Sequence, residues 1–536
     1  MFSEKIHRHI YIFSLILLGI GIPLSVFLMS VSQFLLATNW LLELNFKNKW
    51  LRLKQNKAAI YLIGLFFLHL LWMINSNNWT YGLHDIKIKL PLLVLAILIG
   101  SSEKLHFSEI KLILNFFISS VLISTIISGL IYYDIIHREI TDTRQISIFI
   151  SHIRLSLLVN IAFFSSLYLF SKAEKTLKAL YIINLLWFPF FLFILNSYTG
   201  LFIFIFVLTV TLMRYIFQSN QLWIKKASVL TLIILFVSGI YVIYDSYKRF
   251  SITDQFPQEN QLEKYSLNGN PYRHHTEARQ TENGHFIHIY ICNKELEKEW
   301  DKRSKISFKT GLNKKGELVR FTLLNYLSSL NLKKDSIGMA QLSDEDIKLI
   351  EAGYTNYIYK NKYSIYAKIY PILKQIKSYN NYSYAEGASI SQRFEYLKIA
   401  TRIIKDNFWF GVGTGDVDDT FKKHYANGES SLSEEYQHRA HNQYLTFFIS
   451  FGIFGFIASL FFMFTPVFYE KKQFLPLIFS LIAFLSMLNE DTLETQAGIT
   501  FFTYFYSLFF VAFSFKKEKN YLNHPKTKPI ENSGVL

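Results

Sequence analysis

The chain has 536 residues and a formal net charge of +16, with 51% hydrophobic and only 18% charged residues. A soluble domain usually carries about 25% charged residues, and a disordered chain is poor in apolar ones, so both classes are excluded. The 51 phenylalanines and a mean hydropathy of +0.21 indicate an integral membrane protein. Its excess of Lys and Arg lies mostly between apolar runs, where it sets membrane orientation, so no nucleic-acid partner is expected.

The apolar runs predict the membrane spans. A bilayer span needs about 20 mostly apolar residues, and irregular backbone cannot face lipid, so the runs should be helices. The first run continues past Lys5 and Arg8 without a small-residue cleavage site, so no signal peptide is expected. Twelve spans are predicted, near 10–28, 30–45, 58–75, 88–103, 108–132, 145–170, 178–196, 199–217, 222–244, 441–468, 473–489 and 495–515.

The alternation of basic loops predicts the orientation. The loop at 46–57 is rich in Lys and Arg, and further basic loops fall on the same predicted side, up to the tail that begins at Lys516 and Lys517. The opposite side has the acidic stretch Asn489-Glu490-Asp491. Since basic loops stay cytoplasmic, both termini are predicted to be cytoplasmic, and the loop at 245–439 is predicted to be periplasmic.

The expected fold is all-α in the membrane, with one large mixed α/β periplasmic loop domain between spans nine and ten. A hairpin is predicted at Glu282-Asn283-Gly284, before an alternating run at 285–290, and helices are predicted near 344–352 and 354–376. The single cysteine, Cys292, cannot form an intramolecular disulfide. The predicted segments are 1–244 with nine spans, 245–439 as the loop domain, 440–515 with three spans, and 516–536 as a cytoplasmic tail.

A helix is predicted to begin at Ser389, because Ser389 and Gln392 have the spacing of a capping box. Arg393 lies at the edge of one helix face, either as a surface arginine with a snorkelling stem or as a ligand for an anion. That face is predicted to be buried or interfacial and contains Phe394, Leu397, Thr401, Ile404 and Phe408.

The glycine run Gly411-Val412-Gly413-Thr414-Gly415 follows this helix. Backbone amides in such a run can approach an anion, which makes Gly411 and Gly413 candidate ligands. Three glycines also make an ordinary helix stop. A dinucleotide site is not expected, because the glycines follow a helix and not a strand.

Two histidines lie at the predicted outer mouth of the tenth span. His441 is either a neutral hydrogen-bonded group or a general base near its working pH. It is predicted to share a helix face with Tyr444, Leu445 and Phe448. His438 and His441 could instead bind a metal. The third ligand would have to come from Asp416, Asp418 or His285, and the prediction is that no metal is bound.

Arg154 is predicted about nine residues into the sixth span, at a depth of about 13 Å. An arginine there costs several kcal/mol unless it meets an anion, a carboxylate or water. A structural pairing with Glu490 or Asp491 is the alternative to a functional role. Together with Arg393 and His441, Arg154 suggests a site for a lipid-linked diphosphate with a base nearby, since guanidiniums suit diphosphates.

On these residues the chain resembles the O-antigen ligase and polymerase superfamily. The matching features are the number of spans, the large outer loop, Arg393 ahead of the glycine run, and the pair His441-Asn442 that opens the next span. The resemblance implies metal-independent, inverting glycosyl transfer from undecaprenyl diphosphate at the periplasmic face of the inner membrane, without a cofactor. It makes His441 the base and Arg393 and Arg154 the diphosphate ligands, with His438 and Asn442 in the substrate site.

The resemblance implies a ligase that moves a finished glycan to lipid A–core. A polymerase that joins repeat units is the nearest alternative, followed by a glycan-to-protein transferase, and the motifs do not separate these three. A transporter or flippase would also have many spans and a buried arginine. Transporters often have paired halves with broken helices, and no such internal symmetry is seen in this sequence.

Overall fold

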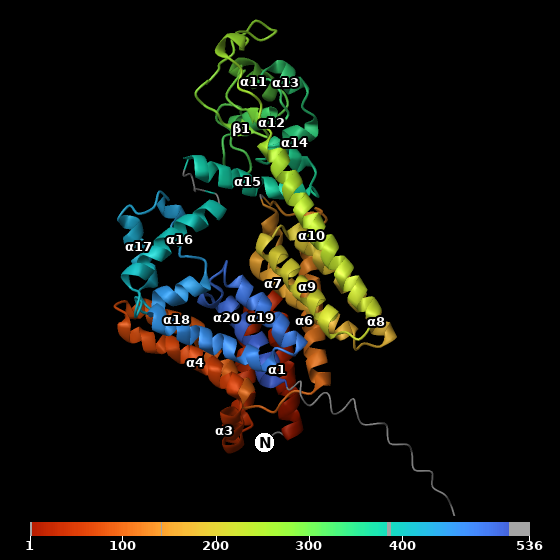
Figure 1. Cartoon of the computed structure of the whole chain (residues 1–536), viewed down its shortest axis with the longest axis vertical. Coiled ribbons are helices and arrows are strands. Elements are labelled where there is room, and N and C mark those ends of the chain that lie inside the picture. The colour runs from red at the N-terminus through yellow and green to blue at the C-terminus, as the bar shows by residue number, and fades with distance from the viewer. Residues whose placement is uncertain (1–2, 141, 383–386, 388, 514–536) are drawn as a thin grey trace, which may run out of the picture. The chain divides into compact units, whose positions relative to one another are not determined.

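The computed structural model describes residues 3–140, 142–382, 387 and 389–513, and these are mostly helical (Figure 1). The chain divides into two compact units, one formed by residues 1–211 with 392–536 and the other by residues 212–391. The segment 392–439, expected in the loop domain, therefore groups with the helical bundle, and the ninth predicted span groups with the second unit. The predicted tail, with Lys516 and Lys517, lies outside the described residues.

The first unit contains most of the long apolar helices, together with shorter and more polar ones. Their bounds are α1 Glu4–Leu24, α2 Val26–Leu42, α3 Phe46–Gln55, α4 Lys57–Leu71, α5 Trp79–Gly100, α6 Phe107–Tyr132, α7 His152–Phe170, α8 Lys175–Leu195, α9 Tyr198–Gln218, α16 Ser389–Asp406, α17 Val417–Ala426, α18 Gln443–Glu470, α19 Phe474–Ser486 and α20 Gln496–Tyr506, which continues as a π-helix over Ser507–Ala512. The unit boundaries fall inside α9 and α16. Short 3₁₀ helices occur at Trp72–Asn75, Thr143–Ile146, Glu434–Tyr436 and Thr492–Glu494.

Each of the twelve predicted spans contains one of these helices or α10 (Leu222–Ser251), but the count of twelve is not confirmed. Among the described residues, eight helices are long and apolar enough to cross a membrane, and the pair α2 and α3, bent by 119°, would make a ninth. Helix α5 is not among them, and α19 and α20 are shorter apolar helices. Four charged or histidine side chains, His84, Asp85, Lys87 and Lys89, lie on the amino-terminal half of α5.

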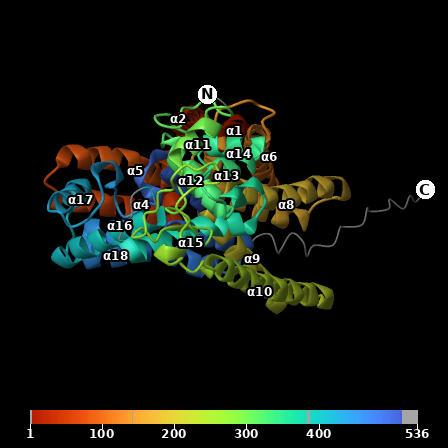
Figure 2. The ribbon, with the colours of Figure 1, turned by 90° about the horizontal axis from the view of Figure 1, so that it is seen from above.

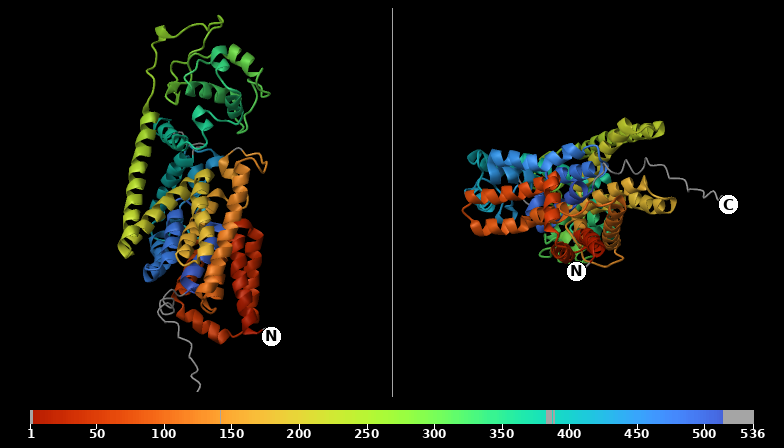
Figure 3. Two further views of the ribbon diagram at one scale, coloured as in Figure 1. Left: turned by 90° about the vertical axis from the view of Figure 1, so that its right-hand side faces the viewer. Right: turned by 90° about the horizontal axis from the view of Figure 1, so that it is seen from below.

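Segments far apart in sequence form the core of the first unit. Helices α4 and α18 lie side by side in Figure 1 and remain together with α5 when seen from above in Figure 2. Helices α1 and α2 pair in the same way (Figure 3). The hydroxyl of Tyr504 on α20 donates to the carbonyl of Leu15 on α1 over 2.9 Å, and both side chains are fully buried. Helices α1 and α20, which are far apart in the sequence, therefore share one apolar core.

The second unit is also built from helices. The predicted hairpin is confirmed, since β1 (Thr281–Glu282) pairs antiparallel with β2 (His285–Phe286) around Asn283 and Gly284. Each strand has only two residues, so the expected mixed α/β character is not confirmed. The core surrounds Trp300 and Tyr326, which are fully buried. Its helices are α10, α11 Asn293–Trp300, α12 Val319–Ser329, α13 Ser336–Ala340, α14 Asp344–Glu351 and α15 Ile365–Tyr382, with 3₁₀ turns at Glu259–Gln261 and Tyr357–Lys360.

Candidate active site

The candidate site in the first unit is organised by residues 488–495, which connect α19 to α20 and are called the site loop below. The carbonyl of Leu488 accepts a hydrogen bond from Asn442 Nδ2 over 2.9 Å. The carbonyl of Asn489 accepts one from Arg393 over 3.4 Å, and the hydroxyl of Thr495 accepts one from Arg154. Three residues that the sequence singled out therefore meet on one short loop.

Helix α16 presents Arg393 to this loop, with its guanidinium 4.0 Å from Glu490 Oε1. The predicted face with Phe394, Leu397 and Phe408 is exposed on the protein, so the prediction of a face buried against protein is wrong. It remains a candidate interfacial face. The face buried against protein carries Tyr396, Ile399, Ala400 and Ile403 instead. Because lipid and protein interiors are both apolar, the spacing of apolar residues does not separate these two environments.

Arg154 lies at the start of a helix and not deep within one. Helix α7 begins at His152, and the side chain of Ser151 caps it by accepting from the amide of Arg154 over 3.4 Å. The prediction that Arg154 lies about nine residues into its helix, which assumed a span beginning near residue 145 and gave the depth of about 13 Å, is therefore wrong, since Arg154 is the third residue of α7. The apolar residues before Ser151 belong to a separate segment that includes the 3₁₀ turn at Thr143–Ile146.

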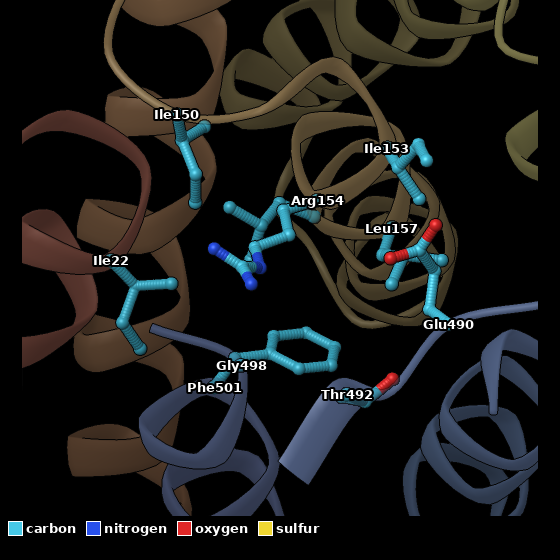
Figure 4. A pocket seen from close by; sticks show the side chains of 10 residues that line it. Ile22, Ile150, Ile153, Arg154, Leu157, Glu490, Thr492, Gly498 and Phe501 are labelled. Atoms are coloured by element: carbon cyan, nitrogen blue, oxygen red, sulfur yellow. The ribbon is translucent and has the colours of Figure 1, made fainter. Parts of the chain in front are cut away.

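Arg154 projects into a small pocket that is partly open to solvent (Figure 4). Glu490 lines the same pocket, while Ile22, Ile150 and Phe501 provide apolar wall. The pocket therefore combines one guanidinium and one carboxyl with a mainly hydrocarbon surface. An amphiphile with an anionic group and an apolar chain has matching chemistry.

His441 is held just before α18, because Asn442 is the N-cap of that helix. The side-chain oxygen of Asn442 accepts from the amides of Tyr444 and Leu445 over 3.0 and 3.1 Å. His441 has a positive φ of 48°, a conformation that is uncommon for residues other than glycine. The predicted helix face with Tyr444, Leu445 and Phe448 is therefore wrong for His441, since the histidine precedes the helix.

An aromatic contact connects the histidines to α16. The ring centroid of Tyr396 lies 5.7 Å from that of His441 and 6.2 Å from that of His438. The two histidine rings are 6.0 Å apart, with His438 exposed and His441 partly buried. The Tyr396 hydroxyl donates to the carbonyl of Tyr436 over 2.8 Å. Helix α16 therefore positions the segment 436–441 as well as Arg393.

Burial and the surrounding charges affect the acid–base groups of the site. Burial lowers the pKa of His441, Asp491 acts to raise it, and the nearby Arg393, His438 and Arg439 side chains lower it further. Burial raises the pKa of Glu490, although Arg393 and Arg154 oppose this rise. A neutral imidazole can accept a proton near neutral pH, and a carboxyl with a raised pKa conflicts less with an anionic ligand.

The glycine run packs against a break in α18. Gly452 has φ 61° and ψ −168°, so α18 is interrupted there. The amide of Ile453 donates to Phe408 O, and the carbonyls left free on α18 accept from the run: Val412 N to Ile449 O over 2.8 Å and Gly413 N to Ser450 O over 2.9 Å. The run therefore satisfies the backbone groups that the kink exposes.

The amides of the glycine run are all used inside the protein. Beyond those of Val412 and Gly413, the amides of Gly411, Thr414 and Gly415 donate to Asn407 O, Trp72 O and Ser76 Oγ. This arrangement favours the alternative of a helix stop over an anion cradle, and Gly411 and Gly413 are not proposed below as substrate ligands.

Gly411→Ala should reduce the thermal stability of the protein. Gly411 has φ 68°, and a Cβ there would lie 2.5 Å from backbone atoms of Ile449 and Gly452. The positive φ alone costs about 1–3 kcal/mol for a residue other than glycine, and the clash adds to it. The measurement is the unfolding temperature of the purified variant. Gly428→Ala is the matched control, since Gly428 has φ 73° and open space around it, and an equal loss in both would contradict the packing role.

The residues considered as a third metal ligand form hydrogen bonds or ion pairs with other groups of the protein. Asp416 accepts from the amides of Asn77 and Asn78, Asp418 lies 3.6 Å from Arg439, and His285 pairs with Asp254 in the second unit. Within the part of the chain that the structure describes, no group of three or more His, Cys, Asp or Glu side chains is arranged to hold a metal ion.

Sequence reasoning missed a group of charged residues behind the site. Glu494 on the site loop contacts Lys89 of α5 and Gln443 of α18. Asp85 and Lys89 interrupt an apolar helix at a spacing of four residues, and ionisable residues in such helices are usually functional. That spacing was the available signal, but the partner Glu494 is 405 residues away in sequence.

Comparison with known proteins gives one family. Residues 351–460 match the model of the O-antigen ligase family. The match covers about a fifth of the chain and includes Arg393, the glycine run, His438, His441 and Asn442, whereas Arg154 lies outside it. It agrees with the resemblance seen in the motifs. No curated protein matches the chain.

Proposed function

We propose that this chain, which carries an O-antigen ligase domain at residues 351–460, transfers a glycan from undecaprenyl diphosphate to an acceptor hydroxyl of lipid A–core at the periplasmic face of the inner membrane. The observation that carries the proposal is the convergence on the site loop of Arg393, Arg154 and the segment of His441 and Asn442. In the proposed reaction the two guanidiniums neutralise the diphosphate and the imidazole is the base.

In the proposed reaction the acceptor oxygen attacks the anomeric carbon of the donor glycan while the bond from that carbon to the phosphate oxygen breaks. His441 accepts the proton of the acceptor hydroxyl, and the lowered pKa of its imidazole keeps the base form available. The diphosphate leaves with the bonding electron pair. Arg393 and Arg154 stabilise the negative charge that develops on it, as charge-assisted hydrogen bonds do.

The pocket at Arg154 supports a lipid-linked donor. Its apolar wall suits the first isoprene units, and its guanidinium suits the diphosphate. Glu490 would oppose a diphosphate only when ionised, and burial raises its pKa. His438 and Asn442 lie beside the proposed base, His438 as an exposed imidazole and Asn442 as a cap that fixes the backbone after His441.

Transfer from a defined donor tests the proposal directly. The purified chain, mixed with undecaprenyl diphosphate-linked glycan and lipid A–core, should produce glycosylated lipid A–core and free undecaprenyl diphosphate. In a deletion strain, loss of all capped core with accumulated lipid-linked glycan would indicate a ligase, whereas core capped by one repeat would indicate the polymerase alternative. Glycosylated protein with intact capping would indicate the protein transferase.

Chelation should leave activity intact. In the proposed reaction arginines neutralise the diphosphate, so treatment with EDTA should not change the transfer rate of the purified chain. The measurement is the initial rate before and after EDTA and after readdition of single divalent ions. Loss of activity restored by one ion would favour a metal held by His438 and His441.

Reporter fusions should follow the charge alternation. Fusions at Gln55 and Ala173 should be cytoplasmic and those at Asn268 and Asn380 periplasmic, because basic loops remain inside. A fusion at Lys519, which lies outside the described residues, should be cytoplasmic. Paired alkaline phosphatase and fluorescent protein fusions give the readout, and a cytoplasmic Asn268 would contradict the proposal, since the donor glycan is displayed outside.

A further inference from the structure

A buried ion cluster connects α5 to the site loop. The side chain of Lys89 is 0% exposed, and its Nζ lies 2.6 Å from Asp85 Oδ1 and 2.9 Å from Glu494 Oε2. Asp85 is one turn earlier on the same helix, whereas Glu494 belongs to the 3₁₀ turn of the site loop. Lys89 therefore connects α5 to the loop that carries the candidate site.

Burying such an ion cluster is unfavourable for the stability of the fold. Removing ions from water costs several kcal/mol per ion, and well-packed apolar residues of similar volume often give equal or greater stability. Helix α5 overlaps the span predicted near 88–103, and ionisable residues within a membrane span mark functional sites by default. The proposed transfer reaction assigns roles to Arg154, Arg393 and His441 but none to Lys89 and Glu494.

The second carboxylate oxygen of Glu494 connects the cluster to the start of α18. Glu494 Oε1 accepts from Gln443 Nε2 over 2.8 Å, and Gln443 Oε1 accepts from the amide of Leu493 over 2.8 Å. The amide of Gln443 also donates to Met487 O over 2.9 Å. Gln443 is fully buried and begins α18, two residues after His441. A continuous set of hydrogen bonds thus runs from Lys89 to the start of the helix that follows the proposed base.

The same carboxylate reaches the segment on the other side of His441. Arg439 Nη1 lies 3.7 Å from Glu494 Oε2, and Arg439 also contacts the hydroxyl of Tyr81 on α5. Burial acts to raise the pKa of Glu494, but the charges of Lys89 and Arg439 hold it well below its usual value. Ionised Glu494 therefore contacts Arg439 before His441 in the sequence and Gln443 after it.

We propose that Lys89 and Glu494 are positioning residues for glycosyl transfer: Lys89 fixes the carboxylate of Glu494, and Glu494 fixes Gln443, Arg439 and the site loop, so that His441 is held relative to Arg154 and Arg393. This inference rests on the proposed function. Neither residue is assigned contact with the donor or the acceptor.

The test compares Lys89→Met, Glu494→Gln, the double variant and Glu494→Asp in the purified full chain in lipid nanodiscs. Each single variant should lower kcat by about 100-fold, the size expected for a misplacement of about 1 Å, with a smaller change in the KM for the donor. The double variant should lose less than the product of the two single losses, because it restores the net charge. Glu494→Asp keeps the charge but shortens the side chain, so it should lower kcat as well.

The pH profile separates positioning from a general loss of structure. The charged and titratable groups around His441 are Arg393 from α16, His438 and Arg439 from its own segment, and Asp491 from the site loop. Glu494→Gln removes a negative charge that offsets Arg439, so the pKa of His441 should fall and the acid limb of kcat should move to lower pH. Lys89→Met removes a positive charge that offsets Glu494, so the pKa of His441 should rise and the limb should move to higher pH. Glu494→Asp keeps the charge, so its limb should not move.

Arg8→Met is the matched control, because it breaks the ion pair of Arg8 with Glu109, whose partners are not in the candidate site. It should keep the kcat of the wild-type chain. Wild-type kcat in Glu494→Asp, or acid limbs that do not move in opposite directions in the two single charge variants, would overturn the inference. Failure of the proposed function is distinguishable, since the wild-type chain itself would then produce no glycosylated lipid A–core from the defined donor.

Discussion

His441→Ala should lower the transfer rate by about 10²–10⁴-fold, the contribution of a lost acid–base group, while donor affinity stays at the wild-type value. His441→Asn should give the same loss. Asparagine tolerates the left-handed backbone conformation that His441 adopts at φ 48°, so this variant separates the loss of the imidazole from a change in backbone strain. The measurement is donor affinity beside transfer rate on the same purified variants.

The pH dependence gives a second readout of the same base. Burial and the cations nearby lower the pKa of His441 from its ordinary value of 6.5. A base is active in its deprotonated form, so the wild-type rate should rise with pH through a limb below 6.5 and then level off. If His441→Ala loses donor binding while the arginine variants keep it, His441 is a binding residue. The base would then be sought first at His438.

The sequence predicted the presence of helices better than their ends and their buried faces. Every predicted span contains a helix, and the hairpin at Glu282-Asn283-Gly284 is present, because runs of apolar residues and turn residues are local signals. The start of α7 at His152 was missed because apolar residues continue across the break before it. The buried face of α16 was missed because Phe394 and Leu397 are as apolar as the residues that pack inward.

The candidate site was predictable in its residue types and not in its geometry. Arg393, Arg154 and Asn442 were named from the sequence, but the loop on which they meet was recognised only as an acidic stretch and as a possible partner of Arg154. Its contacts with Lys89 and Gln443 depend on the packing of α5, α18 and the site loop, which no local pattern encodes. In the glycine run the local pattern was misleading, because a motif typical of anion binding donates its amides here to the carbonyls at the kink in α18.

Arg393→Lys should weaken donor binding by about 10- to 100-fold, because a hydrogen bond to a charged group contributes about 1.5–3 kcal/mol and an ammonium cannot reproduce the planar fork of a guanidinium. Arg154→Ala should also weaken donor binding, and its transfer rate should recover in part at high donor concentration. Since Arg154 lies in the first turn of α7, its removal should not prevent insertion. The measurement is donor affinity with rates over a range of donor concentrations.

Arg402→Lys is the matched control for Arg393→Lys. Arg402 lies on the same helix, and its guanidinium pairs with Glu429 over 2.8 Å, away from the site loop. It should keep wild-type donor affinity, because its partner is a carboxylate of the protein and not the proposed diphosphate. Equal losses in both lysine variants would mean that α16 as a whole responds to the substitution. Unchanged affinity in Arg393→Lys and Arg154→Ala together would remove the arginines from the donor site, and the diphosphate would then need another cation.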